Sequence, residues 1–189
     1  YNVPMAHLGT AEELIKSGRK IKVDRYLVCS AATTEKQVES INDFIICECK
    51  LNPQFIGFGS VHPDFVNIDD ELKRIKAAGV LGVRLPPDFQ RFLIDDKAVF
   101  PMWKAICDND MFALVHTGDK RLPFSDPCRM AAVLEELPKL KVIAAHFGGY
   151  QVWERAYEAY KPGTCYFDIS SSIMFMEKEL VFKFFDKFG

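Results

Sequence analysis

Six short apolar segments recur along the chain at nearly even intervals, and this rhythm limits the fold more than any other feature of the sequence. Each segment is rich in β-branched or aromatic residues and is bounded by turn formers, which is typical of buried strands. Their carboxyl ends lie about 23 to 31 residues apart, roughly one strand–helix unit each. The segments span residues 25–31, 55–61, 81–85, 112–116, 141–146 and 165–170.

Helical patterns fill the intervals between these segments. The pattern over 67–78 stops at Gly79, a common residue just past a helix end. The pattern over 125–140 has Asp126 as its candidate N-cap and Pro127 at the first helical position. The expected helices span residues 33–51, 67–78, 99–110, 125–140, 150–161 and about 173–187.

Strands that alternate with helices predict an α/β fold built on a parallel sheet. The strands are apolar along their length rather than alternating, which indicates that both faces of the sheet are covered. No GxGxxG or P-loop follows any of them, so the fingerprint of a nucleotide-binding fold is missing. We expect one domain over residues 1–189.

Two of the four histidines stand at the ends of apolar strands, each before a glycine turn. His116 ends the strand in "ALVHTGDKR", and His146 ends the strand in "VIAAHFGGY". Parallel strands gather their carboxyl ends at one edge, where α/β proteins build their sites. Because neutral imidazole binds zinc, iron and manganese, the pair are candidate metal ligands. The alternative is that both are hydrogen-bonded structural residues.

Other polar residues follow strands at the same edge. Arg84 is costly to bury without a partner, so it holds either a substrate carboxylate or an internal aspartate. Asp168 is either a metal carboxylate, a general base, or a capping residue of the "SSS" turn. His62, in "SVHPD", is interpreted as a structural turn residue. Phe89 and Gln90 either line the mouth of the site or cover it.

Composition excludes several classes of partner. A net charge of −2 without a dense basic block argues against nucleic acid, and no apolar run approaches the roughly 18 residues of a membrane helix. The six cysteines show no paired CxxC spacing, and Cys29 and Cys165 lie within apolar segments. We therefore expect buried free thiols in a reducing compartment, and a cytoplasmic protein.

Five motifs together resemble one known family: "FGSVHPD", "LGVRLPPDFQRFLIDD", "ALVHTGD", "VIAAHFGGY" and "CYFDISSS". They look like successive strands of the amidohydrolase superfamily, in the amidohydrolase-related branch of hydrolases and zinc-dependent decarboxylases. The resemblance runs from about residue 10 to the end. It implies a (β/α)₈ TIM barrel, of which the six strands are the second to the seventh. It also implies one divalent metal, zinc first with manganese or iron as alternatives, bound by His116 and by His146, which in some members polarises the substrate instead.

The sequence departs from the family pattern in three places. No HxH pair marks a first strand, since His7 lies in "MAHLG", and the sequence stops at "FFDKFG", just before the turn that carries the eighth-strand aspartate of the family would begin. Both losses fall at the ends, so we expect this chain to be part of a longer protein. Arg84 stands where related sequences commonly carry lysine. Because a guanidinium stays protonated, the resemblance does not extend to a carboxylated-lysine site with two metals.

These observations predict a metal-dependent hydrolase in which metal-activated water attacks a C–N or C–O bond of a small substrate. His146 and Arg84 are the expected catalytic residues, and Arg84, Phe89, Gln90 and Phe147 the expected substrate contacts. One alternative is non-oxidative decarboxylation of a small aromatic or unsaturated acid. Another is a non-catalytic, barrel-derived binding domain whose open strand edges are covered by a partner or in a homo-oligomer.

Overall fold

A computed structural model describes residues 8–189, and His7 therefore lies outside the described residues. All six predicted strands form, each somewhat shorter than its apolar segment. They are β1 (Tyr26–Cys29), β2 (Phe55–Ser60), β3 (Gly82–Leu85), β4 (Phe112–Val115), β5 (Lys141–Ala144) and β6 (Tyr166–Phe167).

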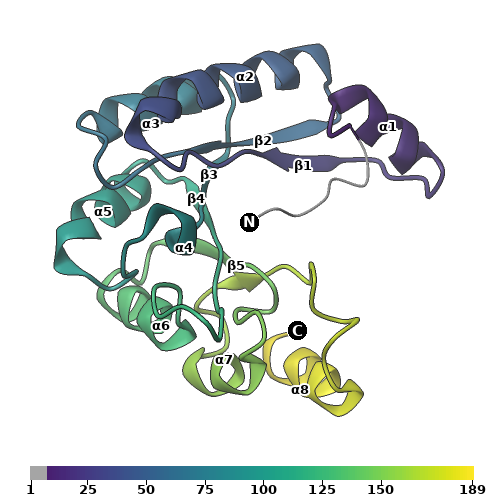
Figure 1. The fold of residues 1–189 in the computed structure, drawn as a ribbon, viewed down its shortest axis with the longest axis vertical. Helices are drawn as coiled ribbons and strands as arrows, with labels where there is room; N and C mark the ends of the chain where they lie inside the picture. The colour runs from purple at the N-terminus through teal and green to yellow at the C-terminus, as the bar shows by residue number, and fades with distance from the viewer. Residues whose placement is uncertain (1–7) are drawn as a thin grey trace.

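The strands form one parallel sheet in the order β1-β2-β3-β4-β5-β6. Each strand pairs with the next one along the chain, which is the winding of a (β/α) barrel rather than of a doubly wound sheet. The sheet curves into a half-barrel with its helices on the convex side, and β1 and β6 stand at the two ends of the arc (Figure 1). The predicted α/β fold with six of eight barrel units is confirmed.

The longer helices cover the outer face of this arc (Figure 1), while the four-residue helix at 87–90 lies at the carboxyl edge of the strands, where Gln90 contacts the loops after β1 and β2. The helices are α1 (Ala11–Arg19), η1 (Glu35–Gln37), α2 (Val38–Leu51), α3 (Ile68–Ala77), α4 (Pro87–Gln90), η2 (Lys97–Val99), α5 (Phe100–Asp108), α6 (Pro127–Glu136), α7 (Trp153–Ala159) and α8 (Lys178–Phe188). The sequence did not predict α1 or α4, and α8 begins at Lys178 rather than near 173. None of the helices within residues 8–189 combines the length and the apolar character needed to cross a bilayer.

Local signals explain where two of these helices begin and end. The carboxylate of Asp126 accepts a hydrogen bond of 2.9 Å from the backbone N–H of Cys128, so it caps α6 as predicted, with Pro127 at the first helical position. Gly79 follows α3 with a φ of +91°, a left-handed conformation that glycine adopts readily.

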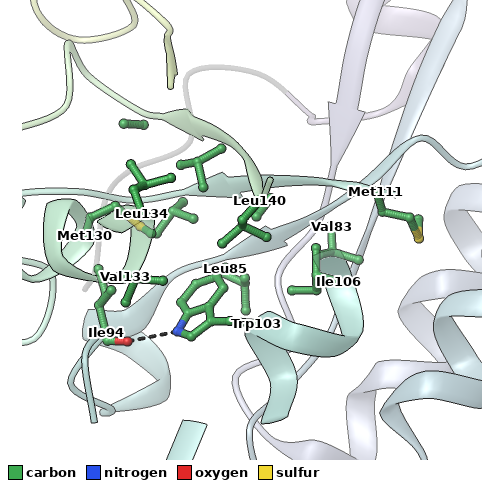
Figure 2. Packing of buried hydrophobic residues seen from close by; sticks show 14 of the residues in the cluster. Val83, Leu85, Ile94, Trp103, Ile106, Met111, Met130, Val133, Leu134 and Leu140 are labelled. Atoms are coloured by element: carbon green, nitrogen blue, oxygen red, sulfur yellow. Dashed lines mark hydrogen bonds between the residues drawn. The ribbon is translucent and has the colours of Figure 1, made fainter. Parts of the chain in front are cut away.

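The main core lies between the sheet and its outer helices. Val83 and Leu85 of β3 pack with Trp103 and Ile106 of α5, and all four side chains are buried (Figure 2). The indole N–H of Trp103 donates to the carbonyl oxygen of Ile94 at 2.9 Å, so this large ring leaves no buried polar atom unpaired. A smaller apolar cluster occupies the inner face of the arc: Phe58, Leu114 and Ala145, with Ile56, Phe112 and Ile143 packed against them.

The expectation of buried thiols is wrong for half of the cysteines. Cys29, Cys47 and Cys128 are exposed, although all six are free. Cys29 ends β1, a strand at the end of the sheet with a neighbour on one side only among the described residues. The apolar sequence around Cys29 therefore did not predict its exposure, because its strand lies at the end of the sheet.

Candidate metal and substrate site

The two strand-end histidines are in direct contact. Nδ1 of His116 lies 3.1 Å from Nε2 of His146, with the two rings nearly perpendicular at a centroid distance of 4.9 Å. They meet because β4 and β5 are neighbours, paired in register through Val115 and Ala144. Zinc–imidazole bonds measure about 2.0–2.1 Å, so one cation could contact both nitrogens.

A left-handed turn directs His146 toward its partner. His146, Phe147 and Gly148 have φ values of +61°, +52° and +71°. For the two non-glycine residues this conformation costs about 1–2 kcal/mol each, so surrounding contacts must hold it. At Gly148 a Cβ would lie 2.6 Å from the ring of Tyr160, which only a glycine avoids. The glycine turn seen in the sequence therefore has a steric cause.

Asp168 accepts several of the hydrogen bonds that stabilise this turn. Its Oδ1 accepts hydrogen bonds from the backbone N–H of His146 at 3.1 Å and of Ser170 at 2.8 Å, and from the Ser170 hydroxyl at 2.5 Å. Its backbone carbonyl also accepts from the N–H of Phe147 at 2.8 Å. This geometry supports the interpretation of Asp168 as the capping residue of the "SSS" turn.

The outward nitrogens of both rings face acceptors. Nδ1 of His146 lies 2.8 Å from the carbonyl oxygen of Ser170, which can only accept, so this nitrogen carries the proton. Nε2 of His116 lies 3.5 Å from Oδ2 of Asp88. With a proton on the outward nitrogen of each ring, two lone pairs face each other at 3.1 Å, an arrangement that a bound cation would stabilise. With the proton on Nδ1 of His116 instead, the same contact is a hydrogen bond donated to Nε2 of His146.

The donor set thus fits a metal ion in part. Two imidazole nitrogens converge, and each ring has an outer acceptor of the kind that orients metal-binding histidines. Within residues 8–189, no group of three or more His, Cys, Asp or Glu side chains gathers to hold a metal ion. The described residues therefore offer two candidate ligands, fewer than the set a divalent metal needs.

The surroundings keep His116 neutral. Burial lowers the pKa of its imidazole to about 4, and the neighbouring charges of His146 and Arg84 act in the same direction against a weaker opposing effect of Asp119. A neutral ring is the form that binds a metal, so no proton has to be displaced from His116 near pH 7.

Sequence reasoning missed Asp88, which lies next to His116. Its side chain is nearly inaccessible, and Oδ2 accepts a hydrogen bond of 2.5 Å from the Ser125 hydroxyl. Burial raises the pKa of this carboxyl, while the bond from Ser125 acts against the rise. The available signal was an acidic residue directly after a strand and two prolines, in "RLPPDFQ".

Arg84 brings an unpaired cation to the same region. It lies on β3, in register between Ser60 and Leu114, and is half-buried. Its guanidinium forms no hydrogen bond or ion pair with any residue in the described part of the chain. Burial lowers the pKa of Arg84, partly offset by Cys29 and Asp168. The internal aspartate considered as its partner is therefore not hydrogen-bonded to it.

Gln90 and Phe89 occupy different positions on α4. The amide nitrogen of Gln90 donates to the carbonyl oxygens of Ala32 and Val61, both at 2.7 Å, and so ties together the loops after β1 and β2. Phe89 is 48% exposed. A substrate contact remains a prediction for both, and Phe89 is the more accessible of the two.

Phe147 and His62 both lie inside the protein. The ring of Phe147 is buried and packs against Phe184 and Phe185 of α8, with centroids 5.0 and 5.7 Å away. This position gives no support to its predicted substrate contact. His62 is buried, and its Nδ1 accepts a bond of 3.2 Å from the N–H of Asp64, in keeping with a structural turn residue.

A parallel half-barrel with polar side chains gathered at its carboxyl edge defines the class of (β/α)-barrel proteins that build sites at that edge. Within this class, the sequence belongs to the amidohydrolase family, whose model matches residues 15–183. No curated protein sequence matches the chain.

Three solved structures illustrate the likeness. A 2,6-dihydroxybenzoate decarboxylase from Rhizobium has a TM-score of 0.70 at 16% identity, over 96% of this chain and 75% of the other. A protein from Acinetobacter baumannii, assigned as a 2-pyrone-4,6-dicarboxylic acid hydrolase, has a TM-score of 0.66 at 13% identity, over 97% and 68%. A 5-carboxyvanillate decarboxylase from Novosphingobium aromaticivorans, complexed with manganese, has a TM-score of 0.61 at 16% identity, over 73% and 49%.

These likenesses concern the fold. The chain spans only 48% to 59% of the length of several of the structures that it resembles. Both hydrolases and decarboxylases occur among the similar structures, so the fold alone does not choose between the two reactions.

Proposed function

We propose that this protein is part of a metal-dependent hydrolase that acts on a small substrate bearing a carboxylate. The observation that carries the proposal is the contact between His116 and His146, 3.1 Å apart beside an arginine without a partner among the described residues. Membership of the amidohydrolase family supports it.

His116 through Nδ1 and His146 through Nε2 would hold one divalent metal, zinc first with manganese or iron as alternatives. The manganese bound to the similar decarboxylase supports a divalent ion of this kind. When bound, such a metal supplies Lewis-acid activation of water for attack on a C–N or C–O bond. The left-handed turn held by Asp168 keeps His146 in place for this task.

Arg84 would bind and orient the substrate. Its planar fork of N–H donors matches the two oxygens of a carboxylate, and a partly buried position strengthens each of these bonds. Phe89, exposed on α4, would offer an apolar surface to a ring-sized substrate. Contacts from Gln90 and Phe147 belong to the same proposal, although the position of Phe147, buried against α8, does not support one.

A second candidate is non-oxidative decarboxylation of a small aromatic or unsaturated acid. The guanidinium of Arg84, which has no hydrogen-bond or ion-pair partner among residues 8–189, favours it, since such an enzyme must hold the carboxylate that it removes. Decarboxylases among the structures of similar fold support it further.

The test uses the protein expressed from its own gene, loaded with zinc or manganese and offered small aromatic and dicarboxylic acids with their amides and lactones. Hydrolysis incorporates ¹⁸O from labelled water into the product, whereas decarboxylation releases carbon dioxide. Charge-assisted hydrogen bonds contribute about 1.5–3 kcal/mol, so Arg84→Met should raise KM about 10- to 100-fold. Arg91→Met, at an exposed arginine, is the matched control.

If the wild-type protein forms neither product, the proposed activity is contradicted. If it also binds no metal, the result favours the non-catalytic binding domain. An unchanged KM for Arg84→Met would remove the assigned role of Arg84 in substrate binding.

A further inference from the structure

Asp88 is a buried carboxylate with few partners. Only 3% of its side chain is exposed, and it is the second residue of α4, the short helix that follows β3. Oδ2 has two neighbours, the Ser125 hydroxyl at 2.5 Å and Nε2 of His116 at 3.5 Å. Oδ1 is buried without a hydrogen-bond partner among the described residues. Because burying a carboxylate is costly, the few groups that face it contribute strongly to its stability there.

The contact with Asp88 influences which nitrogen of the His116 imidazole carries the proton and which carries the lone pair. A neutral imidazole carries one N–H, and the group facing one nitrogen decides where that proton resides. A carboxylate facing Nε2 favours the proton on Nε2 and leaves the lone pair on Nδ1. Nδ1 is the atom that lies 3.1 Å from Nε2 of His146, so in this tautomer its lone pair points into the candidate metal site, whereas a proton on Nδ1 would be donated to His146 instead.

We propose that Asp88 is a positioning residue, which holds the proton of His116 on Nε2 and thereby aims the Nδ1 lone pair at the metal. The inference deepens the proposed function, on which its metal-binding part rests. At 3.5 Å the pair is an electrostatic contact longer than a hydrogen bond, and contacts of this kind tighten when a site is loaded. His146 has an equivalent outer acceptor in the carbonyl of Ser170, 2.8 Å from its Nδ1.

The experiment compares the wild type, Asp88→Ala and Ser125→Ala in the protein expressed from its own gene. Ser125→Ala is the matched control, since it removes the other neighbour of the same oxygen without touching His116. Long-range ¹H–¹⁵N spectra of the ¹⁵N-histidine-labelled, metal-free protein at pH 7 report which nitrogen carries the proton. Zinc affinity is measured in parallel by competition with a chromophoric chelator, with no dependence on turnover.

In the wild type and in Ser125→Ala, we expect His116 to be protonated on Nε2. In Asp88→Ala, that preference should be lost and zinc should bind about 10- to 100-fold more weakly, the usual effect of removing an outer partner of a metal-binding histidine. Ser125→Ala should bind zinc within about threefold of the wild type.

Protonation on Nδ1 in the wild type, or an unchanged tautomer in Asp88→Ala, would overturn the inference. An equal loss of zinc affinity in both variants would also overturn it, because both would then act by loosening the fold. If Asp88→Ala does not fold, Asp88→Leu fills a similar volume without any acceptor and must show the same loss of preference. A wild type that binds no zinc but shows the Nε2 tautomer would refute the metal site while leaving the positioning of His116 intact.

Discussion

Nδ1 of His116 and Nε2 of His146 lie 3.1 Å apart, although thirty positions separate the two residues in the chain. The distance follows from a parallel pairing in which β4 and β5 end side by side, and from a left-handed turn that directs the second ring inward. Each ring presents its other nitrogen to an oxygen acceptor. This convergence of two inward ring nitrogens is the basis of the metal-binding proposal.

His116→Ala should abolish stoichiometric metal binding, because it removes one of the two converging nitrogens. The measurement is the metal content, by elemental analysis, of protein expressed from its own gene and dialysed against zinc. His62→Gln is the control, since His62 is a buried histidine whose Nδ1 is bonded to the N–H of Asp64 in a separate turn. Unchanged metal content in His116→Ala would show that the ring is structural.

Asp168→Ala should destabilise the protein and weaken its metal binding together. Three hydrogen bonds to Oδ1 are lost, two of them exposed and one from the partly buried backbone N–H of His146, and a hydrogen bond contributes about 0.5–1.5 kcal/mol net. Urea unfolding gives the free energy of unfolding. Asp64→Ala, at a largely exposed carboxylate, should change it by less than about 0.5 kcal/mol. Equal effects of the two substitutions would argue against the role given to Asp168.

Gly118→Ala and Gly79→Ala separate steric exclusion from backbone strain. Both glycines have positive φ, +80° and +91°, but a Cβ at Gly118 would lie 2.4 Å from the backbone nitrogen of Tyr150, whereas nothing lies within 4 Å at Gly79. We expect a loss of about 1–2 kcal/mol for Gly79→Ala and about 2–5 kcal/mol for Gly118→Ala. Urea unfolding measures both, and equal losses would contradict the close approach of the two loops after β4 and β5.

Asp126 should make the stability depend on pH in the acid range. Burial acts to raise its pKa, but hydrogen bonds from the N–H of Cys128 and from Arg155 outweigh it, so the pKa lies below 3.8. A carboxylate with a depressed pKa in the folded state stabilises above its unfolded pKa, and this contribution is lost as the pH falls through the folded value.

The comparison is between wild type and Asp126→Asn, which keeps an acceptor at the helix cap. Their difference in unfolding free energy should be present at pH 7 and should shrink as the pH approaches about 3. Urea titrations at several pH values measure it. A difference that stays constant down to that pH would show that the ion pair with Arg155 contributes nothing.

The six strands could be predicted because their signals are local. Apolar and β-branched residues between turn formers favour buried strands wherever they occur, and the even spacing then restricts the fold to successive strand–helix units. The cap at Asp126 and the stop at Gly79 depend on their own few residues in the same way. Helix α4 escaped prediction because its four residues carry no period, and it forms in the space left after β3.

Local sequence patterns showed which side chains stand at the carboxyl ends of the strands, and so His116, His146 and Arg84 could be placed at one edge. The contacts that these side chains make depend on the folded chain. Three contacts join residues far apart in the chain. Asp88 lies next to His116, Phe147 packs against Phe184 of α8, and Gln90 donates hydrogen bonds to two distant loops. No local pattern encodes such contacts, because the direction of each side chain depends on backbone angles and on packing that exist only once the sheet has curved.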